Sequence, residues 1–163
     1  MTAIGGATYT VNMGGWLALR DVGPEVVGNL CVDTHNRQKA EMRGVISPKS
    51  PVNFIVDTGA HVSLIDVSVA RHLGLRPMGG ARVCVIGGRE IQGTRFLACL
   101  ELGLNRKGRE PHMTAIDLVL VGLPLSPNAQ ETHPALLGRD FLRNFSFLYD
   151  GPSGKFALST EVL

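Results

Sequence analysis

The residues best suited to chemistry are Asp57, Thr58 and Gly59, which follow the mostly apolar segment 52–56. β-branched and aromatic side chains in that segment are typical of a buried strand. An acid and a glycine at its end fix a carboxylate at a tight turn, because glycine tolerates turns that other residues resist. A positioned carboxylate can act as a general acid or base. Two such groups at close range share one proton, since like charges do not both ionise.

A second segment, residues 135–137, is apolar without alternation and is followed by Gly138. A run of this kind is expected to be buried on both faces of a sheet. Residues 139–144 predict a short helix, with Asp140 in its first turn and an apolar side that includes Phe141.

A hairpin is predicted between these two segments, because residues 82–86 and 94–102 are extended and apolar. Gly87 and Gly88 lie in the connection, where two glycines allow the backbone to bend. Taken alone, this pair of glycines is more often a plain hairpin turn.

In this order, the three segments resemble the retropepsin-like aspartic protease family. The motifs that carry the resemblance are Asp57-Thr58-Gly59-Ala60 and Leu136-Leu137-Gly138-Arg139-Asp140. The resemblance implies an all-β fold, a small closed barrel with one or two short helices. The signature occurs once, whereas two-lobed relatives carry it twice, so it also implies a two-fold symmetric (C2) homodimer.

By resemblance, the activity is that of an aspartic endopeptidase acting on an extended peptide. The Asp57 residues of both subunits would activate a water, and the Thr58 hydroxyl would bond across the two-fold axis. No metal and no cofactor would be needed. Subsites would be lined by Ala60, His61 and Val62 near the acid, and by Ile86, Gly87 and Gly88 of the hairpin, which would act as a flap.

The segment Leu136, Leu137, Gly138, Arg139 and Asp140 would support the catalytic loop from beneath. One departure concerns its arginine. In many retroviral members an acid that pairs with this arginine follows the tetrad, but here the residue is His61. Asp66 and Asp140 are alternative partners for Arg139, unless the dimer contact is built differently.

Length and composition predict one domain over residues 1–163, with a catalytic core at 46–163 and strands of uncertain role at 1–45. A net charge of +2 argues against a nucleic-acid binder. The absence of a signal pattern or a long apolar run predicts a cytoplasmic protein with no membrane contact. Three scattered cysteines and five unpaired histidines favour small core thiols and no metal site.

The remaining pattern predicts a helix at 67–73 between Asp66 as N-cap and Gly74 as stop. Strands are expected at 9–11, 16–19 and 26–32. A hairpin is expected over 147–158, and it is the better candidate for knitting a dimer. Loops or turns are expected at the following segments: 34–41, 47–51, 76–80, 104–112 and 123–134.

Two alternatives stay open. The chain could be a catalytically inactive member of the same fold, acting as a dimerisation or peptide-binding module. It could also be an unrelated β-barrel in which Asp57 is an ordinary turn acid. The substrate, and whether the chain acts alone or within a polyprotein, are not given by the sequence.

Overall fold

In the computed structural model, the described residues are 7–12, 19, 21, 23–85, 87–106, 109–125 and 135–160. Their strands are β1 (Ala7–Asn12), β2 (Glu25–Val32), β3 (Lys49–Val56), β4 (Leu64–Asp66), β5 (Pro77–Cys84), β6 (Glu90–Arg106), β7 (Arg109–Leu123), β8 (Ala135–Leu137), β9 (Ser146–Asp150) and β10 (Lys155–Ser159). The helices are α2 (Thr34–Met42), α3 (Val67–His72) and α4 (Arg139–Leu142).

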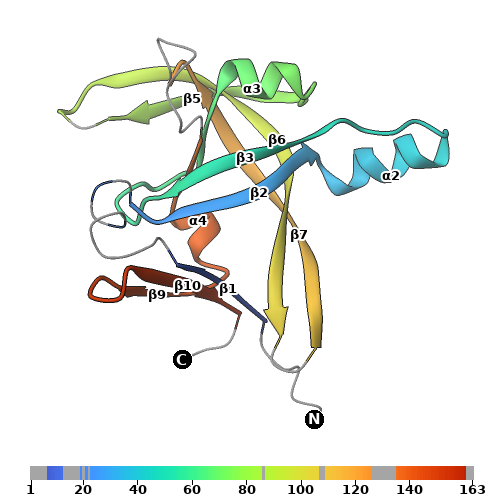
Figure 1. Cartoon of the computed structure of the whole chain (residues 1–163). Helices are drawn as coiled ribbons and strands as arrows, with labels where there is room; N and C mark the ends of the chain where they lie inside the picture. Colours follow the sequence, from blue (N-terminus) through green and yellow to red (C-terminus); the bar gives the residue numbers. More distant parts are fainter. Residues whose placement is uncertain are drawn as a thin grey trace.

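A closed barrel forms the centre of the part of the chain that the structure describes (Figure 1). Its strands follow the order β2-β3-β8-β4-β7-β6, and antiparallel pairing of β2 with β6 closes the ring. Two parallel contacts, β3 with β8 and β4 with β7, lie among antiparallel ones. The predicted all-β closed barrel is confirmed, and the described residues form three short helices where one or two were expected.

The barrel interior is filled by one large cluster of apolar side chains. In β3, Val52, Phe54 and Val56 are buried and alternate with more exposed residues, as a strand with one face on the core requires. Leu100 of β6 and Leu120 of β7 are also fully buried in this cluster. The side chains of Val52, Phe54 and Val56 therefore point into the barrel. Asp57 follows Val56, so the acid lies where β3 ends.

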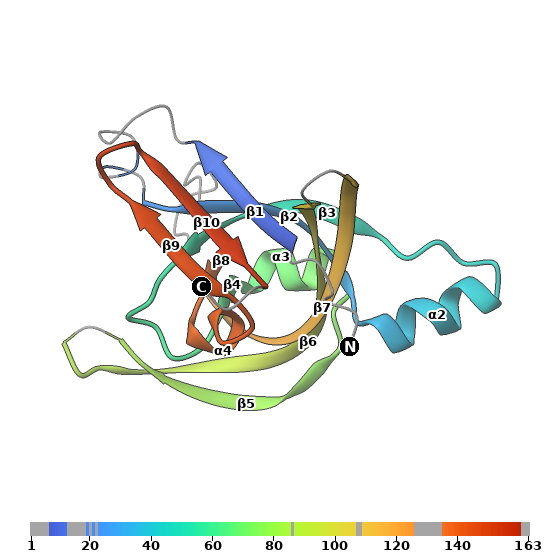
Figure 2. The ribbon, with the colours of Figure 1, turned by 90° about the horizontal axis from the view of Figure 1, so that it is seen from below.

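Two hairpins extend beyond the ring. Among the described residues β5 pairs with β6 alone, whereas β10 pairs with both β9 and β1, which places β1, β9 and β10 side by side (Figures 1 and 2). In Figure 1 the tips of the β5–β6 and β9–β10 hairpins project toward the same side of the barrel. The predicted hairpins at 82–102 and 147–158 are thereby confirmed.

The two helices expected beside the site are present. α3 begins after Asp66, whose carboxylate accepts a hydrogen bond from the Ser68 amide at 2.8 Å, and Gly74 follows it with a φ of 64°. α4 covers the start of the predicted helix at 139–144 and buries Phe141 and Leu142.

One predicted loop is wrong, because residues 34–41 lie in helix α2. The Asp33 carboxylate caps it by accepting from the Asn36 amide at 3.2 Å, and Arg37 and Glu41 are one turn apart on its surface. None of its residues is buried, so it has no apolar periodicity to reveal it. Figure 1 shows α2 projecting away from the barrel.

Three predicted turns are also partly wrong, because strands extend into them. β3 already begins at Lys49, within the expected turn. It can contain Pro51, which has no backbone N–H to donate, because β8 pairs with β3 only from Phe54 onward and the side of β3 facing β8 is unpaired at Pro51. β5 begins at Pro77, which an edge strand tolerates. β6 ends at Arg106 and β7 begins at Arg109, so both strands extend into the turn expected at 104–112.

Some expectations fall wholly or largely outside the described residues. These are Ile86, residues 16–18 of the strand expected at 16–19, and most of the loop expected at 123–134. Within the described part of the chain, no helix is long and apolar enough to cross a membrane.

Candidate active site

The acid predicted to be catalytic is fixed by the backbone around it. The Asp57 amide donates to the Leu137 carbonyl at 2.9 Å as β3 ends beside β8. The Gly59 amide donates to Oδ1 of Asp57 at 2.8 Å, and the Ala60 amide donates to the Asp57 carbonyl at 3.2 Å. Asp57 is half-buried. Its carboxylate is therefore oriented within a tight turn rather than free in solvent.

The segment predicted to support this loop lies directly against it. β8 runs parallel to β3, with Phe54 beside Ala135 and Val56 beside Leu137. At Gly138 a side chain would have no room, because a Cβ atom there would come within 2.7 Å of the Val62 backbone. The Arg139 amide then donates to the Ala60 carbonyl at 3.0 Å. The two segments are joined by main-chain contacts on both sides of Gly138.

A buried serine, which the sequence did not single out, connects the loop to α4. The Ser63 hydroxyl donates to Oδ1 of Asp140 at 2.7 Å and accepts from the Gly138 amide at 3.0 Å. The Ser63 amide donates to the other oxygen of the same carboxylate at 3.0 Å. Ser63 has no exposed surface and Asp140 is half-buried, so the bond to the Gly138 amide is fully shielded from water and the two bonds to Asp140 are partly shielded.

Replacing Ser63 with Ala is expected to lower the free energy of unfolding by about 2 kcal/mol, because Asp140 and the Gly138 amide each lose a partner. Urea unfolding followed by circular dichroism measures this loss. Ser47→Ala is the matched control, since no hydrogen bond joins the Ser47 side chain to another described residue, and its effect should be within about 0.5 kcal/mol. Equal stability of both variants would contradict the role of the network.

Arg139 has a different partner from those expected. Its Nη1 donates to the Thr58 carbonyl at 2.9 Å and is 3.4 Å from the Gly59 carbonyl. The two candidate acids are engaged elsewhere: Asp140 binds Ser63, while Asp66 caps α3 and accepts from the Leu125 amide at 3.0 Å. Arg139 thus fixes the Asp57 loop through the carbonyl groups of that loop, which explains how His61 can replace an acid without leaving the arginine unpartnered.

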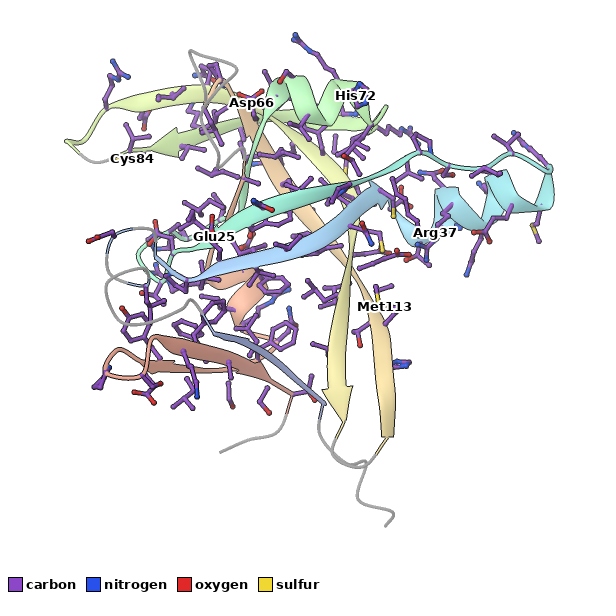
Figure 3. All side chains as sticks on the ribbon, viewed as in Figure 1. Glu25, Arg37, Asp66, His72, Cys84 and Met113 are labelled. Carbon is purple, nitrogen blue, oxygen red and sulfur yellow. The ribbon has the colours of Figure 1, made fainter. Side chains whose placement is uncertain are left out.

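An open groove of about 720 Å³ lies between the Asp57 loop and strand β5. It brings together Asp57 and Gly59 with three of the predicted subsite residues, Ala60, His61 and Val62. The rest of its lining is Leu64, Arg82, Val83, Cys84, Val85 and Leu136. Figure 3 shows Cys84 on β5, within the hairpin that projects beyond the barrel.

Some predicted site residues do not line this groove. Thr58 is exposed beside it, and Gly87 and Gly88 lie beyond it in the turn of the hairpin, both with positive φ. The Gly88 amide donates to the Val85 carbonyl at 3.0 Å, which closes that turn. The sequence analysis did not predict the lining residues Arg82 and Cys84. Both are exposed residues of β5, and the sequence pattern of a strand does not indicate which groove its exposed side chains border.

The groove supplies little that could hold a metal. Asp57 is its one carboxylate, and in the described part of the chain no three His, Cys, Asp or Glu side chains form a metal-binding group. The chemistry available is that of a fixed carboxylate at the floor of an apolar groove, with a backbone amide directed at one of its oxygens.

A family model described as aspartyl protease matches residues 39–141. The chain belongs to the aspartyl protease family. The match spans both the Asp57 loop and the supporting segment, so the family assignment made from those two motifs is confirmed. No curated protein matches the sequence.

Among solved structures, the chain is similar to a retropepsin-like aspartic protease from Rickettsia conorii. The two are 14% identical, the match covers 94% of this chain and 91% of the other, and the TM-score is 0.48.

Proposed function

We propose that this aspartyl protease family member is an aspartic endopeptidase that works as a homodimer, with one Asp57 from each subunit. The observation that carries the proposal is the Asp57 carboxylate, which is oriented by the Gly59 amide at the floor of a groove. A groove of about 720 Å³ that is open along β5 suits an extended peptide.

The reaction follows from placing two such carboxylates together. Like charges at short range keep one acid protonated while the other is ionised. The ionised Asp57 takes a proton from a water, whose oxygen attacks the peptide carbonyl. The protonated Asp57 donates to the carbonyl oxygen, which gives a tetrahedral diol. The first Asp57 then passes the proton it took from water to the leaving nitrogen. As the carbon–nitrogen bond breaks, a hydroxyl of the diol returns a proton to the second Asp57, and the new carboxyl group forms.

The second carboxylate must come from another chain. Asp57 is the one acidic side chain in the lining of the groove, and Asp140 and Asp66 are committed to structural hydrogen bonds. A C2 axis beside the catalytic loop supplies an identical acid. Thr58, next to Asp57, is exposed, so it is available for a contact with the second subunit. Its carbonyl is held by Arg139 of the same chain.

The surface best suited to the two-fold contact is the edge of β9. Within the described residues β9 is the last strand in the sheet order, and a second copy could pair with its outer edge along residues 147–150. Leu148 and Tyr149 are about half exposed on it, at 52% and 50%. β3 runs toward the side on which this hairpin and the β5–β6 hairpin project (Figure 1), so a contact there brings both catalytic loops together.

The β5–β6 hairpin is the proposed flap. In the part of the chain that the structure describes, β5 pairs with β6 on one side, and its other edge could pair with a substrate backbone lying in the groove. Gly87 and Gly88 have φ angles of 92° and 77°, which only glycine adopts without strain, and they let the tip bend over a bound peptide.

The proposal is tested by assaying the full chain against a peptide library over a range of protein concentrations, with sedimentation to measure the dimer fraction. Specific activity should rise with concentration in step with the dimer fraction, because the monomer has half a site. Activity that is constant while the protein is monomeric would contradict the shared site. A dimer that binds peptides and cleaves none would instead favour the inactive binding module.

A further inference from the structure

Two cysteines face each other across the outside of the barrel. Cys31 of β2 and Cys99 of β6 are directly opposite in the antiparallel register, and neither has exposed surface. The Cys31 Sγ is 3.6 Å from the Cys99 carbonyl oxygen, to which it donates. Both thiols are free in this structure.

The backbone at this pair suits a disulfide. Opposite residues in antiparallel strands have Cα atoms about 4.5 or 5.5 Å apart, depending on their hydrogen bonding. Both values fall within the range of about 4.4–6.8 Å found across disulfides. At the level of the Cα atoms, the two strands therefore already have the separation that a disulfide requires.

The pair lies at the seam that closes the barrel. β2 and β6 are joined by four residue pairs, and Cys31 with Cys99 is one of them. Without the β2–β6 pairing, the six ring strands would form an open sheet with β2 at one end and β6 at the other. A covalent bond here would link residues far apart in the chain and fix the ring in its closed form.

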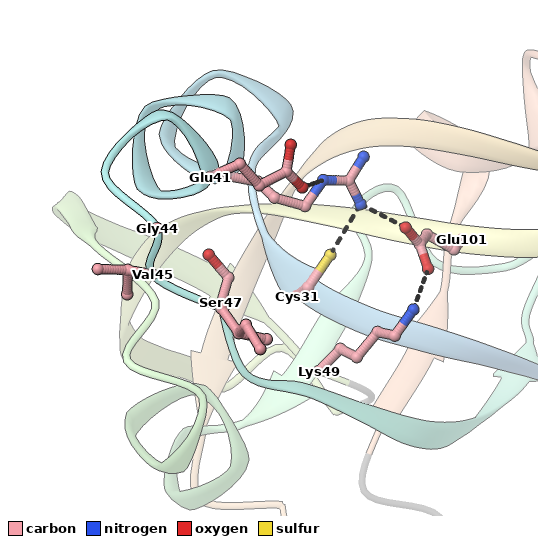
Figure 4. A pocket seen from close by; sticks show the side chains of 9 residues that line it. Cys31, Glu41, Gly44, Val45, Ser47, Lys49 and Glu101 are labelled. Atoms are coloured by element: carbon pink, nitrogen blue, oxygen red, sulfur yellow. Dashed lines mark hydrogen bonds and ion pairs between the residues drawn. The ribbon is translucent and has the colours of Figure 1, made fainter.

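One of the two thiols borders open space. Cys31 lies at the wall of a second pocket, of about 590 Å³, between the barrel and the α2–β3 connection (Figure 4). Arg37 reaches over this wall, with Nη1 3.6 Å from the Cys31 Sγ, and also binds Glu101, which Lys49 contacts at 3.4 Å. The pocket thus ends at Cys31, so a small local opening of this wall would let a reagent reach the thiol, and the Arg37 cation is placed to stabilise a thiolate there.

We propose that Cys31 and Cys99 are a redox-active pair that peroxide converts into a disulfide across the closing seam of the barrel. The Cys31 thiolate attacks one peroxide oxygen, the O–O bond breaks, and a sulfenic acid and hydroxide form. The Cys99 thiolate then attacks the Cys31 sulfur and expels its hydroxyl group as water. In total two thiols and one peroxide give one disulfide and two waters.

The surroundings of the thiols predict slow formation at neutral pH. Burial raises the pKa of Cys31, although the Arg37 cation opposes this, and burial raises the pKa of Cys99 to about 11. A thiol with a raised pKa gains thiolate as pH increases, so the reaction should be faster at pH 9 than at pH 7, by about tenfold or more. Reduction by a small dithiol should reverse it.

The test uses the full chain with Cys84→Ser, which removes the exposed third thiol. After treatment with hydrogen peroxide, digestion without reductant should yield one linked peptide that contains Cys31 and Cys99. The melting temperature should rise by about 5–10 °C, because the bond restricts the unfolded chain. A second variant, Cys31→Ala with Cys84→Ser, should show neither the link nor the rise.

The opposite result is equally clear. If Cys31 and Cys99 are both still alkylated after the oxidised protein is unfolded, the pair does not form a disulfide and the proposal is overturned. Separate sulfinic or sulfonic acids on the two residues would overturn it as well. Both measurements use the protein that retains Cys31 and Cys99, so a folding defect in the alanine variant does not affect them.

Discussion

Asp57→Asn should lower kcat/KM for peptide cleavage by about 10³-fold or more, while the protein folds and dimerises as before. An amide has the shape of the carboxylate but cannot take a proton from water. It can still accept the hydrogen bond from the Gly59 amide, so the loop should keep its conformation. Steady-state kinetics on one cleaved peptide, with sedimentation and circular dichroism of both proteins, measure the effect.

A matched control makes the same chemical change far from the groove. The Asp117 carboxylate accepts from the amide and hydroxyl of Thr34 at 3.0 and 2.9 Å, which the carbonyl of an Asn can also do. Asp117→Asn should therefore cleave at close to the rate of the unmodified protein. If the two variants were equally active, Asp57 would be an ordinary turn acid.

Gly138→Ala should be the most damaging of the small substitutions. A Cβ atom there would be 2.7 Å from the carbonyl carbon and oxygen of Val62 and 3.1 Å from the Ala60 oxygen. These are backbone atoms of the Asp57 loop and cannot rotate away, so the loop must shift from β8. We expect a loss of about 2–3 kcal/mol in the free energy of unfolding, and cleavage reduced by about 10²-fold because the acid is displaced.

Gly103→Ala is the control for this change. Gly103 is also in a strand region, but a Cβ there would lie 3.6 Å from the Met113 Sδ, an ordinary contact. Its effect on stability should stay within about 0.5 kcal/mol. Urea unfolding of the two variants side by side separates the steric clash from the general effect of adding a methyl group. Comparable losses would show that the approach of Gly138 to the loop is not tight.

The parts of the fold that were predictable carry local signals. The apolar segment before Asp57 and the run before Gly138 are buried strands because no polar side chain interrupts them on the core side. Asp66 and Gly74 mark both ends of α3. By contrast, α2 is polar on all sides, and it forms because Asp33 caps it and Arg37 bonds to Glu101 of the barrel. Asp33 directly precedes the helix, but Glu101 is distant in sequence, and no local apolar pattern accompanies the cap.

The candidate site follows the same division. Asp57 and the segment after Leu136 were recognisable because each is a contiguous motif. The contacts that orient them were not, since Ser63 meets Asp140 only when β4 and β8 pair. The partner of Arg139 was missed for a related reason: it binds carbonyl oxygens, which every residue carries and no sequence pattern marks.

The central claim, that one active site is built from two chains, is tested most directly by mixing. A fixed amount of the unmodified protein is combined with a threefold excess of Asp57→Asn, and the subunits are allowed to exchange. If Asp57 acts as a pair across the dimer, about one quarter of the unmodified subunits remain paired with each other, and activity should fall to about one quarter. Activity unchanged by the added variant, in a mixture that sedimentation shows to be dimeric and exchanged, would contradict the shared site.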